Sequence, residues 1–386
     1  MGNGFLTGEQ FESEYFFPMA VGFCPESKML QLIEQPDPQK MFHNHYAFFS
    51  STSTHMQNHF RNFFNEVLKQ IPKNNHDPFV VELGCNDGIL LKHFAKEKIR
   101  HLGIEPSKNV ARIAVSHGVE TISEFFGMDL ARQILKKQGP ADFFLSANVM
   151  CHIPDILGVA RGIHNLLKPG GLLMFEDPYL GAMVEKTSYD QIYDEHVFLF
   201  SAHSVQTLFA KVGMELVDLL PQSTHGGSMR YVLANKGVMK PSPAVRQIMM
   251  KETLQGLDRE EGFSGFRKKV EKSKNDLVVL LKDLKKQGKK VAGYAATSKS
   301  TTILNYCKIG PDLVDYICDT TPIKQGKFSP GMHIPIQPYE YFQKNPPDYA
   351  ILFAWNHSEE IMAKEKEYMA RGGRWITHVP EVRVIA

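Results

Sequence analysis

Short apolar runs alternate with stretches of helical periodicity between residues 79 and 238. An apolar run of about four to eight residues is typical of a buried strand, whereas apolar residues three and four apart indicate a helix. Because helical stretches separate most of the runs, we expect a parallel α/β sheet with helical crossovers. The last two runs follow each other without a helix, which predicts a reversed hairpin at the end of the sheet. The predicted strands are 79–83, 100–104, 119–122, 141–147, 171–177, 215–220 and 229–235.

The regions outside this sheet have different patterns. The N-terminal segment is aromatic-rich and irregular, and the apolar spacing becomes helical from His55 to Gln70. Residues 242–288 have the periodicity of long helices and contain no strand pattern. A second, smaller α/β unit follows. It opens with a strand–loop–helix pattern at Val291-Ala292-Gly293-Tyr294, and further strands are predicted at 313–318, 348–353 and 374–378. We therefore predict an N-terminal segment (1–55), a sheet domain (56–238), a helical linker (239–289) and a C-terminal α/β domain (290–386).

The composition is that of an ordinary globular protein, with 43% hydrophobic and 22% charged residues. The formal net charge of +2 gives no strong attraction to nucleic acid or acidic membranes. No apolar stretch approaches the roughly 18 residues that a membrane helix needs, and no secretion signal is present. The five cysteines are scattered, and no pair has C-x-x-C spacing. We expect a cytoplasmic protein without disulfides and without a nucleic-acid or membrane partner.

The most informative segment is Glu82-Leu83-Gly84-Cys85-Asn86-Asp87-Gly88, which joins a predicted strand to a helix. A dinucleotide fingerprint would place glycines at positions 86 and 89, where this chain has Asn86 and Ile89. The loop therefore favours a smaller nucleoside ligand, with Glu105 accepting hydrogen bonds from its ribose hydroxyls. S-adenosylmethionine (SAM) fits that description. The segment resembles the first motif of SAM-dependent methyltransferases, and the strand pattern resembles the class I methyltransferase fold with its Rossmann-like sheet.

Polar residues follow five consecutive predicted strands. Because ligands bind beyond the carboxyl ends of parallel strands, these residues predict one shared site. Phe126 would stack on the adenine ring, although two adjacent aromatic residues are as often part of a core. The predicted cofactor contacts are Glu82, Gly84, Asn86, Glu105, Ser107, Phe126 and Asn148.

Tyr193, Glu195 and His196 stand within four residues of one another, beyond the fifth strand. An imidazole can take up and release a proton near neutral pH, and a neighbouring carboxylate raises its basicity. A phenol can donate to a developing oxyanion. The sulfonium of SAM is already an electrophile, so the protein must help to generate the nucleophile. The cluster therefore predicts removal of a proton from the methyl acceptor.

At this point the chain is identified as similar to the sugar C-methyltransferases of deoxysugar biosynthesis, which include the tylosin, erythromycin and tetronitrose sugar C-3 enzymes and the novobiocin sugar C-5 enzyme. The resemblance covers nearly all of the chain, and the Tyr-x-Glu-His and His-Gly-Gly-Ser segments are its most specific parts. It is carried by Tyr46…Ser50-Ser51, the 82–88 loop, Asn148-Val149-Met150-Cys151-His152-Ile153-Pro154-Asp155, Tyr193-Asp194-Glu195-His196, His225-Gly226-Gly227-Ser228-Met229-Arg230, Asn305-Tyr306-Cys307-Lys308-Ile309-Gly310-Pro311 and Lys324-Gln325-Gly326-Lys327.

The resemblance implies a nucleotide-linked 4-keto-6-deoxy sugar, of dTDP or GDP type, as the acceptor. Its 4-keto group acidifies the hydrogens on C3 and C5, and the enolate carbon would attack the methyl group, with C3 favoured over C5. The family pattern implies His196 as the base. Tyr193, Glu195, His152 and Tyr46 would surround the ketone, and His225 would face the sugar. In the C-terminal domain Lys299, Ser300 and Lys324 would hold the diphosphate. A monomer or small homo-oligomer is expected.

Two segments depart from the family pattern. Family members carry an N-terminal four-cysteine zinc site, whose second half reads Phe-Cys-x-x-Cys. Here Phe23-Cys24-Pro25-Glu26-Ser27 keeps one cysteine, and one thiolate cannot complete a tetrahedral site. We therefore predict no bound metal. The second departure is Gly293-Tyr294-Ala295-Ala296-Thr297-Ser298-Lys299-Ser300, where the added hydroxyls could change the nucleotide preference.

Three other readings stay open at this level. In a sugar O-methyltransferase, His196 would deprotonate a hydroxyl instead of a carbon. A non-catalytic SAM-binding or sugar-nucleotide-binding protein would not need His196 for its role. An NAD-dependent oxidoreductase is disfavoured by Asn86 and Ile89.

Overall fold

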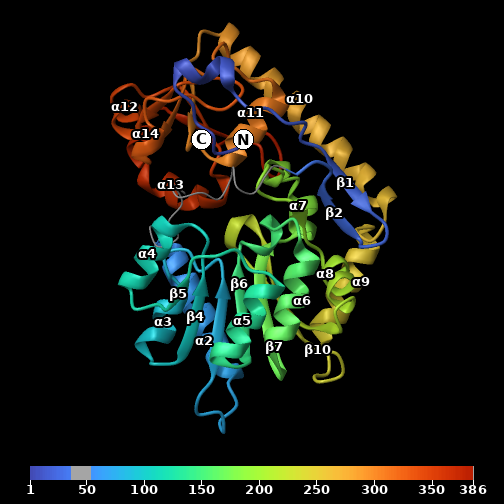
Figure 1. Cartoon of the computed structure of the whole chain (residues 1–386). Helices are drawn as coiled ribbons and strands as arrows, with labels where there is room; N and C mark the ends of the chain where they lie inside the picture. Colours follow the sequence, from blue (N-terminus) through green and yellow to red (C-terminus); the bar gives the residue numbers. More distant parts are fainter. Residues whose placement is uncertain (36–53, 386) are drawn as a thin grey trace.

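The computed structural model describes residues 1–35 and 54–385, and within these ranges it contains three β-sheets (Figure 1). The largest sheet has seven strands in the order β5-β4-β3-β6-β7-β10-β9. The five strands from β5 to β7 are parallel, and β10 is antiparallel to both of its neighbours. The bounds are β3 (Phe79–Leu83), β4 (Arg100–Ile104), β5 (Thr121–Ile122), β6 (Ala141–Ala147), β7 (Leu167–Pro178), β9 (Met214–Gln222) and β10 (Ser228–Asn235). The predicted reversed hairpin is confirmed.

Helices cover both faces of this sheet. Neighbouring residues of a strand point to opposite sides, so each strand packs against helices on both faces. Val80 packs with Phe63 and Phe94 on one face, whereas Val81 packs with Ile134 and other residues on the opposite face. Both faces are therefore dry, which explains why the strands are almost wholly apolar. The helices are α2 (Thr54–Gln70), α3 (Leu91–Lys96), α4 (Lys108–Ser116), α5 (Met128–Gln138), α6 (Ile156–Leu166), α7 (Leu180–Lys186) and α8 (Ala202–Ala210), with short 3-10 helices η3 (Met150–His152), η4 (Tyr189–Gln191) and η5 (Thr224–Gly226).

The N-terminal segment is more regular than the sequence predicted. After η1 (Gly8–Ser13), the strands β1 (Val21–Cys24) and β2 (Met29–Leu32) form a hairpin. Strand β2 also pairs with β8 (Phe198–Leu199), just beyond the Tyr193–His196 cluster. Tyr46 and the Ser50-Ser51 motif lie outside the described residues.

Two helices, α9 (Pro243–Gln255) and α10 (Ser264–Lys286), lead from the large sheet to the C-terminal domain, with η6 (Glu260–Phe263) between them. Figure 1 shows α10 along the outer edge of the upper domain, running down toward α9 beside the lower sheet. This agrees with the long helices predicted for residues 242–288. Among the described residues, none of the helices has both the length and the apolar character required to span a bilayer.

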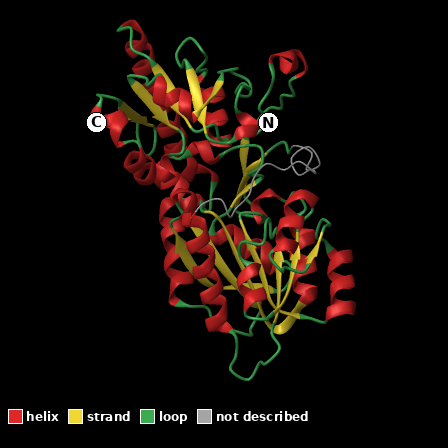
Figure 2. Ribbon diagram, turned by 90° about the vertical axis from the view of Figure 1, so that its left-hand side faces the viewer, coloured by secondary structure: helices red, strands yellow, loops and turns green. Residues whose placement is uncertain are grey.

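The C-terminal domain has a six-stranded sheet in the order β13-β12-β11-β14-β15-β16, with helices on both faces (Figure 2). Its first five strands are parallel, and β16 is antiparallel to β15. The elements are β11 (Val291–Tyr294), α11 (Ser298–Cys307), β12 (Tyr316–Asp319), η7 (Pro322–Lys324), β13 (Ile336–Pro338), α12 (Tyr339–Lys344), β14 (Tyr349–Leu352), η8 (Trp355–His357), α13 (Ser358–Lys364), α14 (Lys366–Ala370), β15 (Arg374–Thr377) and β16 (Arg383–Ile385).

Candidate active site

A cavity of about 400 Å³ lies at the carboxyl ends of the strands of the large sheet. Its wall combines residues of the large sheet, the 193–196 cluster and the C-terminal domain, including the N-terminus of α11 and η8. The predicted site residues that line it are Gly84, Asn86, Glu105, Phe126, Asn148, His152, Tyr193, Glu195, His196, His225, Lys299 and Lys324. The structure therefore brings together residues that are separated by up to 240 positions in the chain (324 − 84).

The loop after β3 requires glycine at position 84. Gly84 has a φ angle of +70°, and a Cβ built on it would lie only 2.3 Å from Cγ2 of Val149. The next residue but one, Asn86, also has a positive φ, of +48°. The loop therefore turns sharply at the cavity wall, where a side chain at position 84 would collide with Val149.

Glu105 follows β4, and its carboxylate faces the loop of Gly84. Oε2 accepts a hydrogen bond from the backbone N–H of Asn86 at 3.2 Å, and Oε1 accepts one from the backbone N–H of Ser107 at 2.8 Å. Burial raises the pKa of Glu105, although these two hydrogen bonds oppose the shift. Since each carboxylate oxygen has a second lone pair, Glu105 can still accept from the hydroxyls of a ribose.

Two predicted cofactor residues lie beneath the cavity instead of in its wall. The side chain of Glu82 is buried, and burial together with Asp87 and Glu105 raises its pKa well above the ordinary value. Ser107 is also buried and stands at the N-cap position of α4, and its backbone N–H donates to Glu105. Their positions fit support of the loop and of Glu105 better than direct contact with a ligand. Phe125, the neighbour of Phe126, also lines the cavity and is 57% exposed.

His196 forms a hydrogen-bonded pair with Tyr193. Its Nδ1 lies 2.8 Å from the carbonyl oxygen of Gln191, which can only accept, so Nδ1 carries the proton. Nε2 then has a free lone pair in the neutral ring and accepts the Tyr193 hydroxyl at 2.6 Å. Burial, with a smaller effect of His152, lowers the pKa of His196 well below its ordinary value. The imidazole is therefore neutral near pH 7, with its proton-accepting atom toward Tyr193.

Two further titratable groups stand beside this pair. His152, on η3, stacks on His196 with 5.4 Å between ring centroids, and burial lowers its pKa to about 4. Burial and the neighbouring Asp194 raise the pKa of Glu195 to about 7, while a hydrogen bond from Asn3 and the charge of Lys324 oppose that shift. The site therefore holds neutral imidazoles and a carboxyl group that titrates near neutral pH.

The three remaining predicted contacts differ in position. His225 lies in the turn η5 with a φ of +53°, and burial and Lys299 lower its pKa to about 3. Lys299 and Lys324 reach the cavity from the C-terminal domain, and burial lowers the pKa of both. Ser300, by contrast, is fully buried and belongs to the capping box of α11, where its Oγ donates to the Thr297 carbonyl. We therefore correct the expectation of a direct contact from Ser300.

Several residues of the cavity wall were not predicted from the sequence. Asn3 donates to Oε1 of Glu195 at 2.8 Å, although it belongs to the segment expected to be irregular. The others come from the amino end of α11 and from η8. Among these residues, only Thr297 and Ser298 had been singled out in the sequence, as hydroxyls of the 293–300 segment. The missed polar residues are Asn3, Thr297, Ser298, Asn356 and His357.

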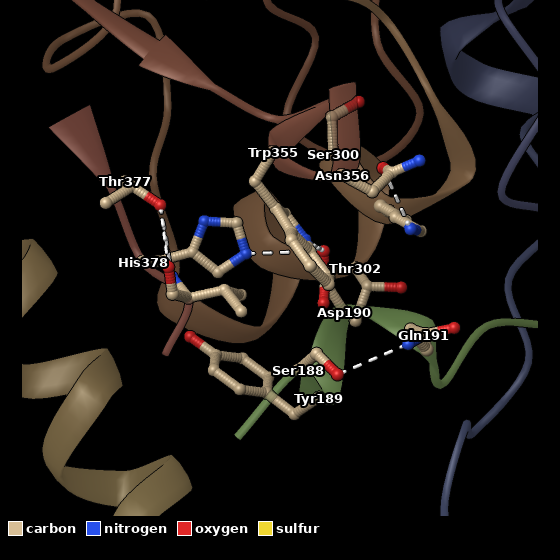
Figure 3. Close-up of polar contacts among 12 residues, drawn as sticks. Ser188, Tyr189, Asp190, Gln191, Ser300, Thr302, Trp355, Asn356, Thr377 and His378 are labelled. Atoms are coloured by element: carbon tan, nitrogen blue, oxygen red, sulfur yellow. Dashed lines mark hydrogen bonds and ion pairs between the residues drawn. The ribbon is translucent and has the colours of Figure 1, made fainter. Parts of the chain in front are cut away.

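A buried polar network joins the two domains behind the cavity (Figure 3). Asp190, from η4, accepts a hydrogen bond from Nε1 of Trp355 at 2.6 Å and lies 3.3 Å from Nε2 of His378. Asp190 and His378 are fully buried. Lys299 donates to Oδ1 of Asn356, next to Trp355, at 3.2 Å. Asp190 also precedes Gln191, whose carbonyl fixes the proton on His196.

One group among the described residues has the composition of a metal site. The ligand atoms of Cys151, His152 and His196 lie within 4.8 Å of one another. Both ring nitrogens of His196 already have partners, in Gln191 and Tyr193. We therefore interpret this group as part of the acid–base cluster, and the expectation of no bound metal stays a prediction.

Comparisons with known proteins match both the region of the large sheet and the C-terminal region. A family model described as a methyltransferase domain matches residues 52–219, and one described as a C-methyltransferase C-terminal domain matches residues 223–380. The C-methyltransferase NovU of Streptomyces niveus is 34% identical over 386 residues, which cover 99% of this chain and 91% of that protein. A ubiquinone biosynthesis O-methyltransferase of Ralstonia nicotianae is 28% identical over 151 residues, 38% of this chain and 53% of that protein. The solved structure of magnesium protoporphyrin IX methyltransferase from Synechocystis with bound SAM covers 47% of this chain and 79% of that chain, at 13% identity and a TM-score of 0.36.

The seven-stranded sheet, its one reversed strand and the methyltransferase-domain match define a class I SAM-dependent methyltransferase. SAM is its cofactor. The similarity to NovU over nearly the whole chain goes further: the chain belongs to the C-methyltransferase family.

Proposed function

We propose that this C-methyltransferase acts on a nucleotide-linked 4-keto-6-deoxy sugar and methylates the carbon next to its ketone, at C3 in preference to C5. The observation that carries the proposal is the wall of the cavity, which combines the loop of Gly84, the His196–Tyr193 pair and two lysines of the C-terminal domain. An enzyme for a small hydroxylated acceptor without a phosphate would not need the two lysines. The motif resemblance to sugar C-methyltransferases supports the same substrate class.

The first part of the cavity fits SAM. Glu105 presents a carboxylate that is already fixed by two backbone hydrogen bonds, as recognition of two ribose hydroxyls requires. The glycine loop offers its backbone to the adenosine, and Phe126 and Asn148 line the same cavity. When bound, SAM supplies an electrophilic methyl group on a sulfonium. The residues of this chain bind it and direct that methyl group toward the acceptor.

His196 acts as the general base. Its neutral imidazole offers Nε2 as an acceptor, and its Nδ1–H stays with the carbonyl of Gln191. We infer that Tyr193 turns its hydroxyl to the ketone oxygen when the sugar binds, which leaves Nε2 for the hydrogen on the adjacent carbon. The Tyr193 O–H then stabilises the enolate oxygen, and ionised Glu195 stabilises the imidazolium that forms. The enolate carbon is the nucleophile for methyl transfer, and His152 completes the wall beside it.

The nucleotide diphosphate would lie toward the C-terminal domain. Lys299 and Lys324 bring two cationic side chains to the cavity, and Thr297 and Ser298 at the N-terminus of α11 line it as well. A ten-residue helix that starts at a cavity provides a positive end for a phosphate. Because Lys324 also donates to the carbonyl of Ala296, its ammonium is held in place before a ligand binds.

Exchange of the sugar hydrogen with solvent tests this proposal before any methyl transfer. The enzyme is incubated in D₂O with S-adenosylhomocysteine and a dTDP-4-keto-6-deoxyhexose, and deuterium is followed by NMR. We expect deuterium to enter the carbon next to the ketone with the native enzyme and not with His196→Gln. Absence of exchange in the native enzyme, together with methylation of a hydroxyl, would instead identify a sugar O-methyltransferase.

A further inference from the structure

The indole ring of Trp355 is wedged between the two domains. On one side it packs on the turn of His225, so closely that a Cβ added to Gly226 would lie 2.1 Å from its Cη2. On the other side, Nζ of Lys299 lies 4.9 Å from the centroid of the indole ring. His225 and Lys299 both line the cavity, one from each domain. The position of this ring therefore sets the separation of two groups that face the substrate.

Asp190 holds that ring in place. It accepts from Nε1 of Trp355 at 2.6 Å and is flanked on the same oxygen by His378 at 3.3 Å. Figure 3 shows Asp190 between these two side chains, so that the methyltransferase sheet region supplies the acceptor and the C-terminal domain supplies both partners. Burial alone would raise the pKa of Asp190, but His378, Lys299 and Trp355 lower it overall. The carboxylate is therefore charged, and its loss would leave an indole N–H without its acceptor.

We propose that Asp190 and Trp355 are positioning residues for the nucleotide sugar: the Asp190–Trp355 hydrogen bond fixes the indole ring, and the ring places His225 and Lys299 at the spacing that the sugar diphosphate requires. This inference rests on the proposed function, because it takes Lys299 as a diphosphate ligand. It assigns no chemical step to either residue. Both act through the two groups that the ring supports, and SAM binding at the opposite part of the cavity does not depend on them.

The charge of Asp190 also affects the pKa of Lys299. Lys299 is faced by Asp190 from η4, by His225 from η5, by His357 from η8 and by His196. Burial lowers the pKa of Lys299, and Asp190 opposes that shift. Removing the negative charge therefore lowers this pKa further. A diphosphate that needs a charged Lys299 should then dissociate at a lower pH in an Asp190→Asn variant than in the native enzyme.

Titration calorimetry with dTDP, in the presence of S-adenosylhomocysteine, tests the inference on the full chain from pH 6 to pH 10. We expect Asp190→Ala, which removes the acceptor, and Trp355→Phe, which removes the donor, each to weaken dTDP binding by about tenfold or more, as loss of a buried charge-assisted hydrogen bond predicts. The double variant should be no weaker than the worse single variant, because both remove the same bond. Binding of S-adenosylhomocysteine should change by less than about twofold. In Asp190→Asn alone, the alkaline loss of dTDP binding should begin at lower pH.

Asp142→Asn is the matched control. Asp142 is also an aspartate in an ion pair, with Lys168, but it lies at the amino end of β6, away from the cavity. It should lower the thermal midpoint and leave dTDP binding unchanged. Native dTDP affinity in both Asp190→Ala and Trp355→Phe would overturn the inference and leave the proposed function intact. No dTDP binding by the native enzyme would overturn the role of Lys299, and the inference with it. Additive losses in the double variant would show that the two residues act separately, which also contradicts the inference.

Discussion

The Tyr193 hydroxyl donates to Nε2 of His196 across 2.6 Å, while the opposite nitrogen of the ring donates to the carbonyl of Gln191. This arrangement leaves one atom of the imidazole, Nε2, to exchange its partner when an acceptor enters. It also explains why a histidine whose pKa is lowered by burial can still act: the ring is neutral, its tautomer is fixed, and the atom that accepts the proton is the one toward the cavity.

Replacement of His196 by Gln should abolish catalysis without loss of cofactor binding. A positioned general base contributes about 10²- to 10⁴-fold, so we expect kcat to fall by about that factor. The dissociation constant of SAM should stay within about threefold, because Glu105 and the glycine loop are unchanged. The measurement is methyl transfer from radiolabelled SAM, with calorimetry for binding. His164→Gln changes an exposed histidine on α6 and serves as the control. Full activity of His196→Gln would remove His196 from the mechanism.

The pH dependence of kcat should show the ionisation of Glu195. The pKa of this group is raised to about 7, so the carboxylate form gains population as the pH rises through neutrality. Because the account requires the carboxylate beside the imidazolium, kcat should rise between pH 6 and pH 8. Glu195→Gln should lower kcat and flatten this limb of the profile. A native profile that falls over the same interval would mean that the protonated carboxyl is the active form.

Glu105→Gln should weaken the binding of SAM. The carboxylate lies at the cavity wall beside the loop of Gly84, and a charge-assisted hydrogen bond contributes about 1.5–3 kcal/mol. We therefore expect the dissociation constant of SAM to rise by roughly 10- to 100-fold, with little change in the affinity for dTDP. Glu124→Gln, an exposed acid after the next strand, should bind SAM normally. Equal affinities in the two variants would exclude Glu105 from the ribose site.

The buried Arg230–Glu176 pair should make the fold sensitive to acid. The guanidinium of Arg230 lies 2.7 Å from Oε2 of Glu176, and both side chains are almost fully buried. Burial would raise the pKa of Glu176, but His59 and Arg230 lower it to about 2. Since this lies below the ordinary value of 4.5, the stabilisation is complete above about pH 4.5 and is lost as the pH falls toward 2.

Arg230→Met tests this pair because it leaves the carboxylate buried without its cation. We expect the free energy of unfolding at pH 7 to fall by about 3–5 kcal/mol, measured by urea denaturation. The difference from the native chain should shrink at pH 3. Lys251→Met removes an exposed pair with Glu185 and should cost less than about 1 kcal/mol. A loss for Arg230→Met no larger than that of the control would contradict the account.

The large sheet could be predicted well because its strands are buried on both faces. The predicted bounds of β3, β4 and β6 agree with the structure to the residue. The strands that were missed are short or lie at edges: β1 and β2 have four residues each, β13 and β16 have three each, and β8 has two. The pairing of β2 with β8 depends on a contact between residues near 30 and near 199, which no local pattern encodes.

The site could be predicted where function leaves a local signal. Gly84, Glu105 and His196 follow strands or stand in dense polar clusters, and they line the cavity. Asn3 and Asn356 could not be found in this way because single asparagines in loops are common, and only the folded chain brings them to the wall. Ser300 shows the reverse case: its position in a hydroxyl-rich loop suggested a ligand, but the helix uses it as a cap.

The most direct test of the central claim is an NMR assay with SAM labelled with carbon-13 in its methyl group and a dTDP-4-keto-6-deoxyhexose made in situ. The account predicts a new carbon-bound methyl signal on the sugar ring, next to the ketone, that is absent with His196→Gln. An oxygen-bound methyl signal would contradict the carbon chemistry. Tight binding of SAM with no transfer to dTDP-, GDP-, UDP- or CDP-linked keto sugars would contradict the proposed substrate class.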